Sequence, residues 1–371
     1  MTREPNTQYV LSLSYGKDSL ACLEAIRILG LPLDRIVHAE VWATDTIPAD
    51  LPPMVEFKKK ADEIILKRYG IVVEHICAVE RERDHSRSRD SSTLSDGTRK
   101  SEENVSTDSQ WSEALGVTPN SNSQPSNELR KLTFEKLFYH IPKRRGGERE
   151  RERERETVQS RDSQIDGTCI ATNSNPERYW IRYGFPRRKM PFCQSRLKAN
   201  ILDRYIRIPL HGDAKRRDGV VSSTQIHAFS PRPFEQGAKI NTVQYLGIAA
   251  DEPERIARHT KPGVVLPLVL AGWDEAFCRQ LCKELDLLSP IYTDSARGGC
   301  WFCHNQGIDQ LRLLRRNYPE LWALLLKWDK DSPVSFHPDG HTVHHFDLRF
   351  QAEDEGRVPT DRKFRWKMLN L

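Results

Sequence analysis

The 371-residue sequence predicts an α/β fold: a doubly wound, Rossmann-like, mostly parallel sheet with a helical C-terminal region. Two observations favour it. Apolar strand patterns alternate with amphipathic helix patterns through the first eighty residues, and a tight polar turn follows the first strand directly. Such alternation is typical of parallel strands joined by right-handed crossovers, which bind ligands at the carboxyl ends of the strands.

The elements are expected in the following order. Strands are predicted at 9–13, 36–41 and 71–76, joined by helices at 19–29 and 54–69. A core helix around 132–141, a helix at 199–207, a strand at 243–248 and a helix at 274–285 follow. The last eighty residues carry leucine and tryptophan at helical spacing, and we expect Trp322 and Trp328 to be core residues.

Two long stretches, 81–130 and 145–175, are rich in Ser, Asn, Asp, Arg and Glu and almost lack apolar periodicity. We predict that both are disordered inserts. The segments 1–80, 131–144 and 176–290 would then form one α/β domain, and 291–371 a cysteine-containing helical region.

The composition narrows the classes of protein. The net charge of +5 permits a nucleic-acid partner without requiring one. No apolar run reaches the roughly 18 residues that a membrane span needs, and the N-terminus does not resemble a leader, so a cytoplasmic location is expected. Eight cysteines in such a chain favour reduced thiols or metal ligands over disulfides. Cys22 and Cys77 fall within predicted elements and are expected in the core.

The turn after the first strand has the composition of a phosphate site. A helix N-terminus offers backbone N–H groups and partial positive charge, Gly16 permits close approach of an anion, and Lys17 adds a full charge. The turn also contains Ser14, Tyr15, Asp18 and Ser19. The alternative is an ordinary strand-to-helix turn in which Ser14 or Asp18 caps the helix.

Three segments carry a family resemblance. The turn resembles the SxGKDS loop of the PP-loop ATP pyrophosphatases, in the adenine nucleotide alpha hydrolase-like superfamily. The segments 192–198 and 245–255 resemble the WCxxxLK and GIRxDES-x-R motifs of the phosphoadenosine phosphosulfate (PAPS) reductase family. The chain departs from these patterns at Tyr15, Phe192, Ala249 and Pro253, where Gly, Trp, Arg and Ser are usual.

The resemblance implies an adenine nucleotide, ATP or a sulfonucleotide (PAPS or APS), bound with Mg²⁺. The catalytic residues would be Lys17 and Asp18. The nucleotide-binding residues would be Ser14, Tyr15, Gly16, Lys17, Asp18, Ser19, Asp45, Thr46, Arg196, Lys198, Gly247, Asp251, Glu252 and Arg255. Simpler interpretations stay open: Asp45 and Thr46 as a plain polar loop, the basic residues as surface charges, and Asp251 as a cap.

A metal site is the second prediction. Cys300 and Cys303 are two residues apart beside two glycines, so both thiolates can point at one ion. Cys193 follows a proline at a predicted helix start, a position that lowers a thiol pKa. In related enzymes similar cysteines hold a four-iron four-sulfur cluster, with Cys282 here the nearest fourth ligand by sequence. Zinc, which His304 would suit, and no metal at all are the alternatives.

Three functions remain compatible with these motifs. The first is cleavage of ATP between its α and β phosphates, which adenylates an acceptor for sulfur transfer to a nucleic acid or metabolite, with a sulfur donor protein as partner. The second is a sulfonucleotide reductase, which is disfavoured because no cysteine follows Cys303 to attack the sulfur. The third is a non-catalytic nucleotide-binding subunit of a mobile-element or defence system.

Overall fold

The computed structural model describes residues 2–80, 130–140, 183–187, 191–207, 220–222, 240–294, 298–361 and 363–369. The predicted disordered inserts, 81–130 and 145–175, lie outside the described residues except for residue 130. The chain divides into two compact units. One contains Met1–Glu135 and Lys189–Leu321, and the other contains Lys136–Arg188 and Trp322–Leu371.

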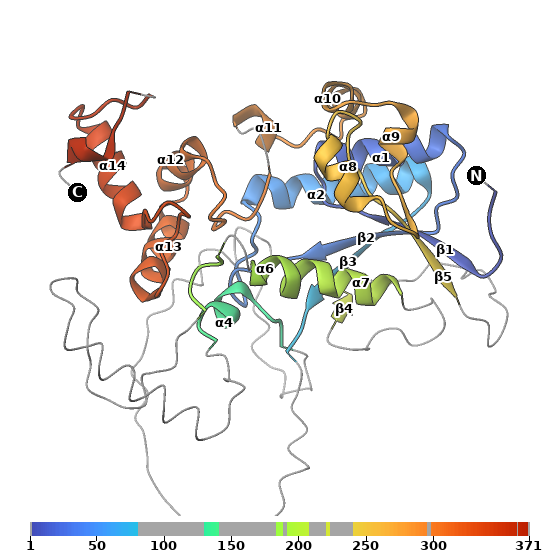
Figure 1. Cartoon of the computed structure of the whole chain (residues 1–371), viewed down its shortest axis with the longest axis horizontal. Helices are drawn as coiled ribbons and strands as arrows, with labels where there is room; N and C mark the ends of the chain where they lie inside the picture. The colour runs from blue at the N-terminus through green and yellow to red at the C-terminus, as the bar shows by residue number, and fades with distance from the viewer. Residues whose placement is uncertain are drawn as a thin grey trace, which may run out of the picture. The chain divides into compact units, whose positions relative to one another are not determined.

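The first unit contains an α/β sheet whose strand order is β4-β3-β2-β1-β5-β6 (Figure 1). Five strands pair in parallel, and β4 joins the edge antiparallel to β3. The strands are β1 (Thr7–Ser12), β2 (Arg35–Glu40), β3 (Val73–Ala78), β4 (Val220–Ser222), β5 (Asn241–Tyr245) and β6 (Val264–Val265). The chain runs outward from β1 in both directions, so the loop after β1 lies at the change of direction.

Helices cover both faces of this sheet. Figure 1 shows α1 (Lys17–Ile28) and α2 (Pro52–Tyr69) on one face and α7 (Asn200–Ile206) on the other. The first unit also contains α6 (Phe192–Gln194), the π-helical turn η3 (Ser195–Ala199), α8 (Pro253–His259), α9 (Pro267–Ala271), α10 (Glu275–Glu284), α11 (Ile291–Asp294) and α12 (Ile308–Asn317). Helix α1 packs against α9 and α10, which fixes its N-terminal end beside the start of α10.

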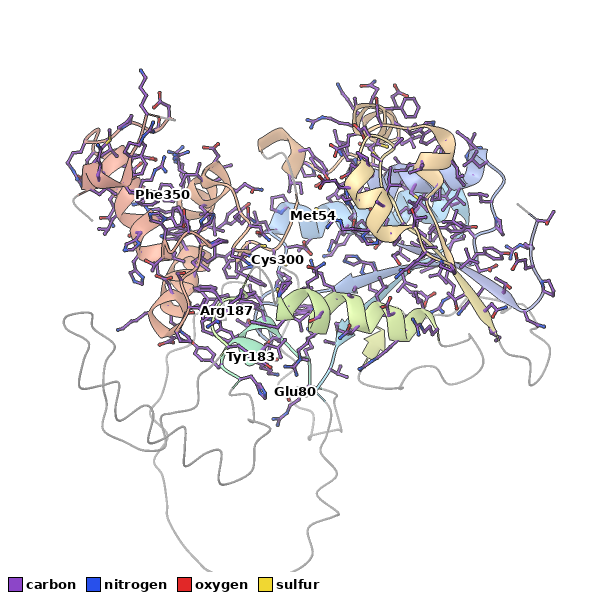
Figure 2. The ribbon with its side chains drawn as sticks, viewed as in Figure 1. Met54, Glu80, Tyr183, Arg187, Cys300 and Phe350 are labelled. Carbon is purple, nitrogen blue, oxygen red and sulfur yellow. The ribbon has the colours of Figure 1, made fainter. Side chains whose placement is uncertain are left out.

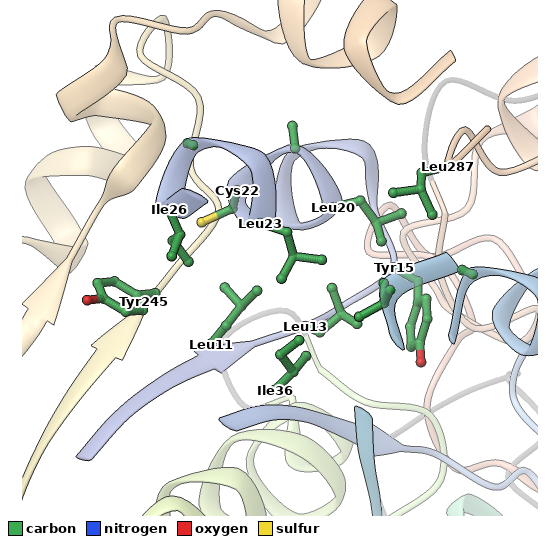
Figure 3. Close-up of a cluster of buried hydrophobic side chains, with 14 of the residues drawn as sticks. Leu11, Leu13, Tyr15, Leu20, Cys22, Leu23, Ile26, Ile36, Tyr245 and Leu287 are labelled. Atoms are coloured by element: carbon green, nitrogen blue, oxygen red, sulfur yellow. The ribbon is translucent and has the colours of Figure 1, made fainter. Parts of the chain in front are cut away.

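The core beneath the first loop is built by β1 and α1 together. Leu11 of β1 is buried together with Leu20, Leu23 and Ile26, which α1 places on one side at helical spacing (Figure 3). Tyr245 of β5 lies at the other end of the same cluster. A buried and therefore rigid strand-loop-helix unit thus presents the turn that sequence analysis singled out.

Most predicted elements of the first unit are present with shifted ends. The predicted strand at 243–248 ends at Tyr245, because the chain leaves the sheet there and passes the start of α1 through Gly247. Strands β4 and β6 were not predicted, since runs of three and two residues carry no measurable periodicity. Cys22 and Cys77 are buried, as expected.

The second unit is helical in its described residues. It contains α14 (Val343–Asp354) and the 3-10 turn η4 (Trp366–Leu369), and α4 (Phe134–Phe138) and α13 (Pro319–Asp331) each cross the division between the units. Trp322 and Trp328 are buried, which confirms their predicted core role. The ring of Trp328 stacks on Phe138, 5.9 Å between centroids. Among the described helices, none has the length and apolar character needed to cross a membrane.

Candidate functional site

The loop after β1 is closed by its own two serines. The Oγ of Ser19 accepts a hydrogen bond from the Ser14 backbone N–H at 3.2 Å and one from the Ser14 hydroxyl at 3.0 Å. It donates to the Gly16 carbonyl at 2.9 Å, and the Tyr292 hydroxyl accepts the Lys17 N–H at 3.2 Å. The turn is therefore a fixed scaffold at the helix N-terminus.

Tyr15 adopts a left-handed backbone conformation, with φ of 56°. Only glycine takes this conformation without strain, so other contacts must hold the tyrosine there. The Tyr15 hydroxyl donates to Asp62 and lies 3.0 Å from Nε2 of His75, while His38 meets the ring edge-on at 4.8 Å. These side chains anchor the loop from beneath.

Gly16 does not require the backbone freedom that is particular to glycine. This residue has an ordinary extended conformation, with φ of −75°, and an added Cβ would lie 3.5 Å from its nearest neighbours. The conformation that favours glycine belongs to Tyr15, one residue earlier.

A cavity of about 600 Å³ opens against this loop at the carboxyl ends of β1 and β2. Ser14, Tyr15 and Gly16 form part of its wall, and Met54 and Cys300, labelled in Figure 2, also line it. The described lining includes the aromatic residues Tyr15, Tyr292, Trp301 and Tyr318 and the amide side chains of Gln306, Gln310 and Asn317. All of these residues belong to the first unit.

Lys58, which was not predicted from the sequence, is a buried cation that lines this cavity. Its Nζ donates to Asp50 at 2.6 Å and lies 2.9 Å from Nε2 of His38. The other nitrogen of His38, Nδ1, lies 2.8 Å from the Leu13 carbonyl. Burial, reinforced by Lys58 and His75, lowers the pKa of His38 well below its usual value. His38 is therefore neutral, with Nδ1–H donating to Leu13 and Nε2 accepting from Lys58.

Lys198 is the second cation that lines the cavity, and it was among the predicted residues. It lies on η3, and its pKa is raised, first by the Cys300 sulfur and also by Asp50. With His38 neutral, the charged residues among the described residues of the lining are Lys58, Lys198 and Asp50, two positive and one negative. The cavity therefore carries an excess of positive charge and suits an anion.

Lys17 does not line the cavity. Its Nζ contacts Asp18 at 2.8 Å and Glu275 at 3.0 Å. Burial alone would lower the pKa of Lys17, but these two hydrogen bonds raise it. Burial raises the pKa of Asp18, and Glu275 and Glu252 add to the rise.

One carboxylate oxygen from each of Asp18, Glu252 and Glu275 lies within 4.8 Å of the others. In the part of the chain that the structure describes, no other set of three or more His, Cys, Asp or Glu ligand atoms is so close. Lys17 contacts two of these carboxylates and Arg255 pairs with Glu252, so the cluster carries an excess of one negative charge on this side of the loop.

The residues after β5 that were predicted to bind the nucleotide make contacts within the protein instead. A Cβ on Gly247 would lie 2.6 Å from the Asp18 carbonyl and 2.6 Å from Ser19 Cα, so glycine lets the β5 loop touch α1. Asp251 accepts the Glu275 N–H at 3.1 Å, as in its capping alternative, although the helix it caps is α10. Arg255 is exposed and pairs with Glu252 at 2.6 Å. None of these residues lines the cavity.

Asp45, Thr46 and Arg196 are not brought to the cavity wall either. Asp45 and Thr46 are exposed in a short turn after β2, where the Thr46 N–H bonds Thr44 Oγ1 at 3.3 Å. The aspartate of this loop that does line the cavity is Asp50.

The structure brings the two predicted cysteine segments together. Phe134 stacks on Phe192, beside Cys193, at 6.0 Å and contacts Phe302, between Cys300 and Cys303, at 4.2 Å. The pKa of Cys193 is not lowered by its helix, because α6 has only three residues. Burial, with Cys300 and Cys303 nearby, raises this pKa to about 12. Cys300 lines the cavity, and burial raises its pKa too.

Cys282 is not brought to these three thiols. It is fully buried in the core of α1 and α10, and its S–H donates to the Lys17 carbonyl at 3.1 Å. The sulfur atoms of Cys193, Cys300 and Cys303 also do not meet the 4.8 Å spacing that the acidic set satisfies. Tetrahedral zinc, with Zn–S of about 2.3 Å, would need sulfurs roughly 3.8 Å apart.

Sequence reasoning missed His38, Asp50 and Lys58. A signal for Lys58 exists, because it falls four residues after Met54 and three before Ala61, on the buried face of α2. Its neighbours Lys59 and Lys60 are exposed, and the run of three lysines disguises the difference.

Comparison with protein-family models, with curated proteins and with solved structures finds no significant match to this chain.

Proposed function

We propose that the chain binds an adenine nucleotide in the cavity beside Ser14–Gly16 and cleaves ATP between its α and β phosphates. We also propose that the α/β fold of the first unit is of the doubly wound, nucleotide-binding type. One observation carries it: the loop that leads into α1 forms the wall of a positively charged cavity at the carboxyl ends of parallel strands. Helix N-termini at this position of α/β folds bind phosphate groups.

The cavity also suits the rest of a nucleotide. Its volume of about 600 Å³ lies within the range of small-molecule sites, roughly 300–1,000 Å³. Aromatic side chains such as Trp301 and Tyr318 offer faces on which an adenine ring can stack. Amides such as Gln310 and Asn317 supply donors and acceptors for the ring edge.

The reaction proposed is adenylation of an acceptor, a nucleic acid or a metabolite, followed by displacement of AMP by sulfur from a donor. Cleavage between the α and β phosphates forms a bond from the acceptor oxygen to the α phosphorus and releases pyrophosphate. The chain would stabilise the charge on the departing oxygens by its cavity lysines and by the N–H groups at the start of α1.

The three thiols fit part of an iron–sulfur ligand set. Cys193, Cys300 and Cys303 come from two segments that share a contact with Phe134, and Cys300 faces the cavity. They would hold a four-iron four-sulfur cluster by three ligands, and such a cluster supplies one open iron for sulfide. Their present spacing fits a single zinc ion less well. Iron analysis after anaerobic purification tests this, with loss of iron expected in Cys300→Ala and retention in Cys77→Ala.

Incubation of the anaerobically purified chain with Mg-ATP, sulfide and total RNA tests the reaction. The expected products are AMP and pyrophosphate in equal amounts. ADP and phosphate would show cleavage of the other phosphate bond and would contradict the proposed chemistry. Binding of ATP without any product, with or without RNA, would favour the non-catalytic nucleotide-binding subunit.

A further inference from the structure

The two lysines near the first loop lie in opposite electrostatic surroundings. Lys17 contacts the carboxylates of Asp18 and Glu275, and the nearby Glu252 is paired with Arg255, which leaves one excess negative charge around Lys17. Lys58 faces the cavity, where the described lining contains two lysines and one aspartate. An anion that enters the cavity therefore meets net positive charge from Lys58 and Lys198, whereas the field around Lys17 is negative.

Lys58 is held with one donor available. An ammonium group has three N–H donors, and Asp50 and His38 take two of those on Lys58. In the described part of the chain no partner takes the third. Since Lys58 lines the cavity and is 9% exposed, this donor is left for a group inside it.

The position of Lys58 is also fixed before any ligand arrives. His38 is itself held by the Leu13 carbonyl, and the Tyr15 ring lies 5.3 Å beneath the Lys58 ammonium. Leu13 and Tyr15 belong to the loop after β1, so the network ties the cation to the loop that forms the phosphate wall. A cation held in this way loses little side-chain freedom on binding.

We propose that Lys58, together with Lys198, binds the anionic polyphosphate end of the ligand, and that Lys17 instead neutralises Asp18 and Glu275 as part of the scaffold. The inference rests on the proposed function for the identity of the ligand. It assigns the anion to Lys58 of α2 and not to Lys17 at the start of α1.

The test compares dissociation constants of ATP, adenosine and inorganic tripolyphosphate by calorimetry. Lys58→Met is expected to weaken ATP and tripolyphosphate by about tenfold or more, the loss of one charge-assisted hydrogen bond, and adenosine by less than about threefold. The exposed neighbour supplies the matched control, because Lys59→Met removes the same charge from the same helix and should change none of the three. Equal loss in both variants would overturn the inference, since it would show a general charge effect.

A charge-balanced double variant tests the role of Lys17. Lys17→Met with Glu275→Gln removes both members of an ion pair, so ATP affinity should stay within about threefold of the parent chain. A loss as large as that of Lys58→Met would make Lys17 the phosphate ligand and overturn the assignment.

The outcomes separate the two proposals. If the parent chain binds tripolyphosphate through Lys58 but does not bind ATP, the anion site stands and the nucleotide function fails. If it binds ATP and Lys58→Met binds it equally well, the nucleotide function stands and the lysine assignment fails. Circular dichroism spectra of all variants verify that the fold is retained.

Discussion

His75 lies between two carboxylates under the first loop. Its ring links the Tyr15 hydroxyl to Glu40 of β2. Nδ1 of His75 is 2.9 Å from Glu40, and Nε2 is 2.9 Å from Asp62. Burial alone would lower the pKa of His75, but the bonds to Asp62 and Glu40 raise it to about 9. The doubly protonated ring is therefore the form that the folded protein stabilises at neutral pH.

This arrangement predicts a loss of stability at high pH. A folded-state pKa of about 9 against an unfolded value of 6.5 means that the contribution is complete below pH 6.5 and is lost as pH rises through 9. It amounts to at most about 3 kcal/mol. Urea unfolding of the parent chain and of His75→Gln at pH 6 and pH 10 measures it. The difference between the two proteins should be largest at pH 6, and a difference that grows toward pH 10 would contradict the ion-pair network.

At the scale of elements, the contact between the β5 loop and α1 decides where the first loop sits. Gly247 allows that contact because its missing Cβ would meet backbone atoms of Asp18 and Ser19 at 2.6 Å. Gly16 lies in the loop itself, yet a Cβ there would make only ordinary contacts at 3.5 Å. Substitution by alanine is therefore expected to destabilise the protein at Gly247 and not at Gly16.

Gly247→Ala should destabilise the chain by about 1–3 kcal/mol and weaken nucleotide binding, because α1 must move away from β5. Gly16→Ala should leave the melting temperature nearly unchanged, since its φ of −75° suits alanine. Thermal unfolding of both variants, with ATP titrations, measures this. Equal destabilisation by the two substitutions would mean that the packing of the β5 loop on α1 is not what fixes the turn.

The elements around the first loop differ in how well the sequence predicts them. The β1-loop-α1 unit is readable because its periodicity is local: Leu20, Leu23 and Ile26 repeat at helical spacing directly after an apolar strand. The roles of Lys58, His38 and Asp50 are harder to predict from the sequence. Their role depends on three segments meeting in space, and a buried lysine within a run of three resembles a solvated helix face. Lys17, the most prominent lysine of the motif, has its charge offset by Glu275, which lies 258 residues later in the sequence.

At the scale of the whole molecule, the described ends of the polar segments lie side by side. The Glu80 N–H bonds the Arg130 carbonyl at 2.8 Å, and Val79 pairs with Lys131. On the far side of the second segment, the Tyr183 N–H bonds the His140 carbonyl at 3.1 Å. The chain therefore leaves and rejoins its described part at nearly the same point each time.

Replacement of residues 81–129 by Asn-Gly, a dipeptide that closes tight antiparallel turns, is expected to preserve the fold and nucleotide binding. The reason is that Glu80 and Arg130 already lie within hydrogen-bond distance, so the shorter link imposes no new geometry. Calorimetric ATP titration of the shortened chain checks this. Loss of ATP affinity in a protein that still unfolds cooperatively would show that the removed segment contributes to the site.

The central claim is that the loop after β1 and Lys58 together receive the phosphates of an adenine nucleotide. A crystal structure with α,β-methylene ATP, which cannot be cleaved between its first two phosphates, tests it most directly. The account predicts phosphate oxygens about 2.7–3.2 Å from Lys58 Nζ and from backbone N–H groups of the loop. A nucleotide bound elsewhere, with Ser14–Gly16 and Lys58 making no contact to it, would contradict the claim.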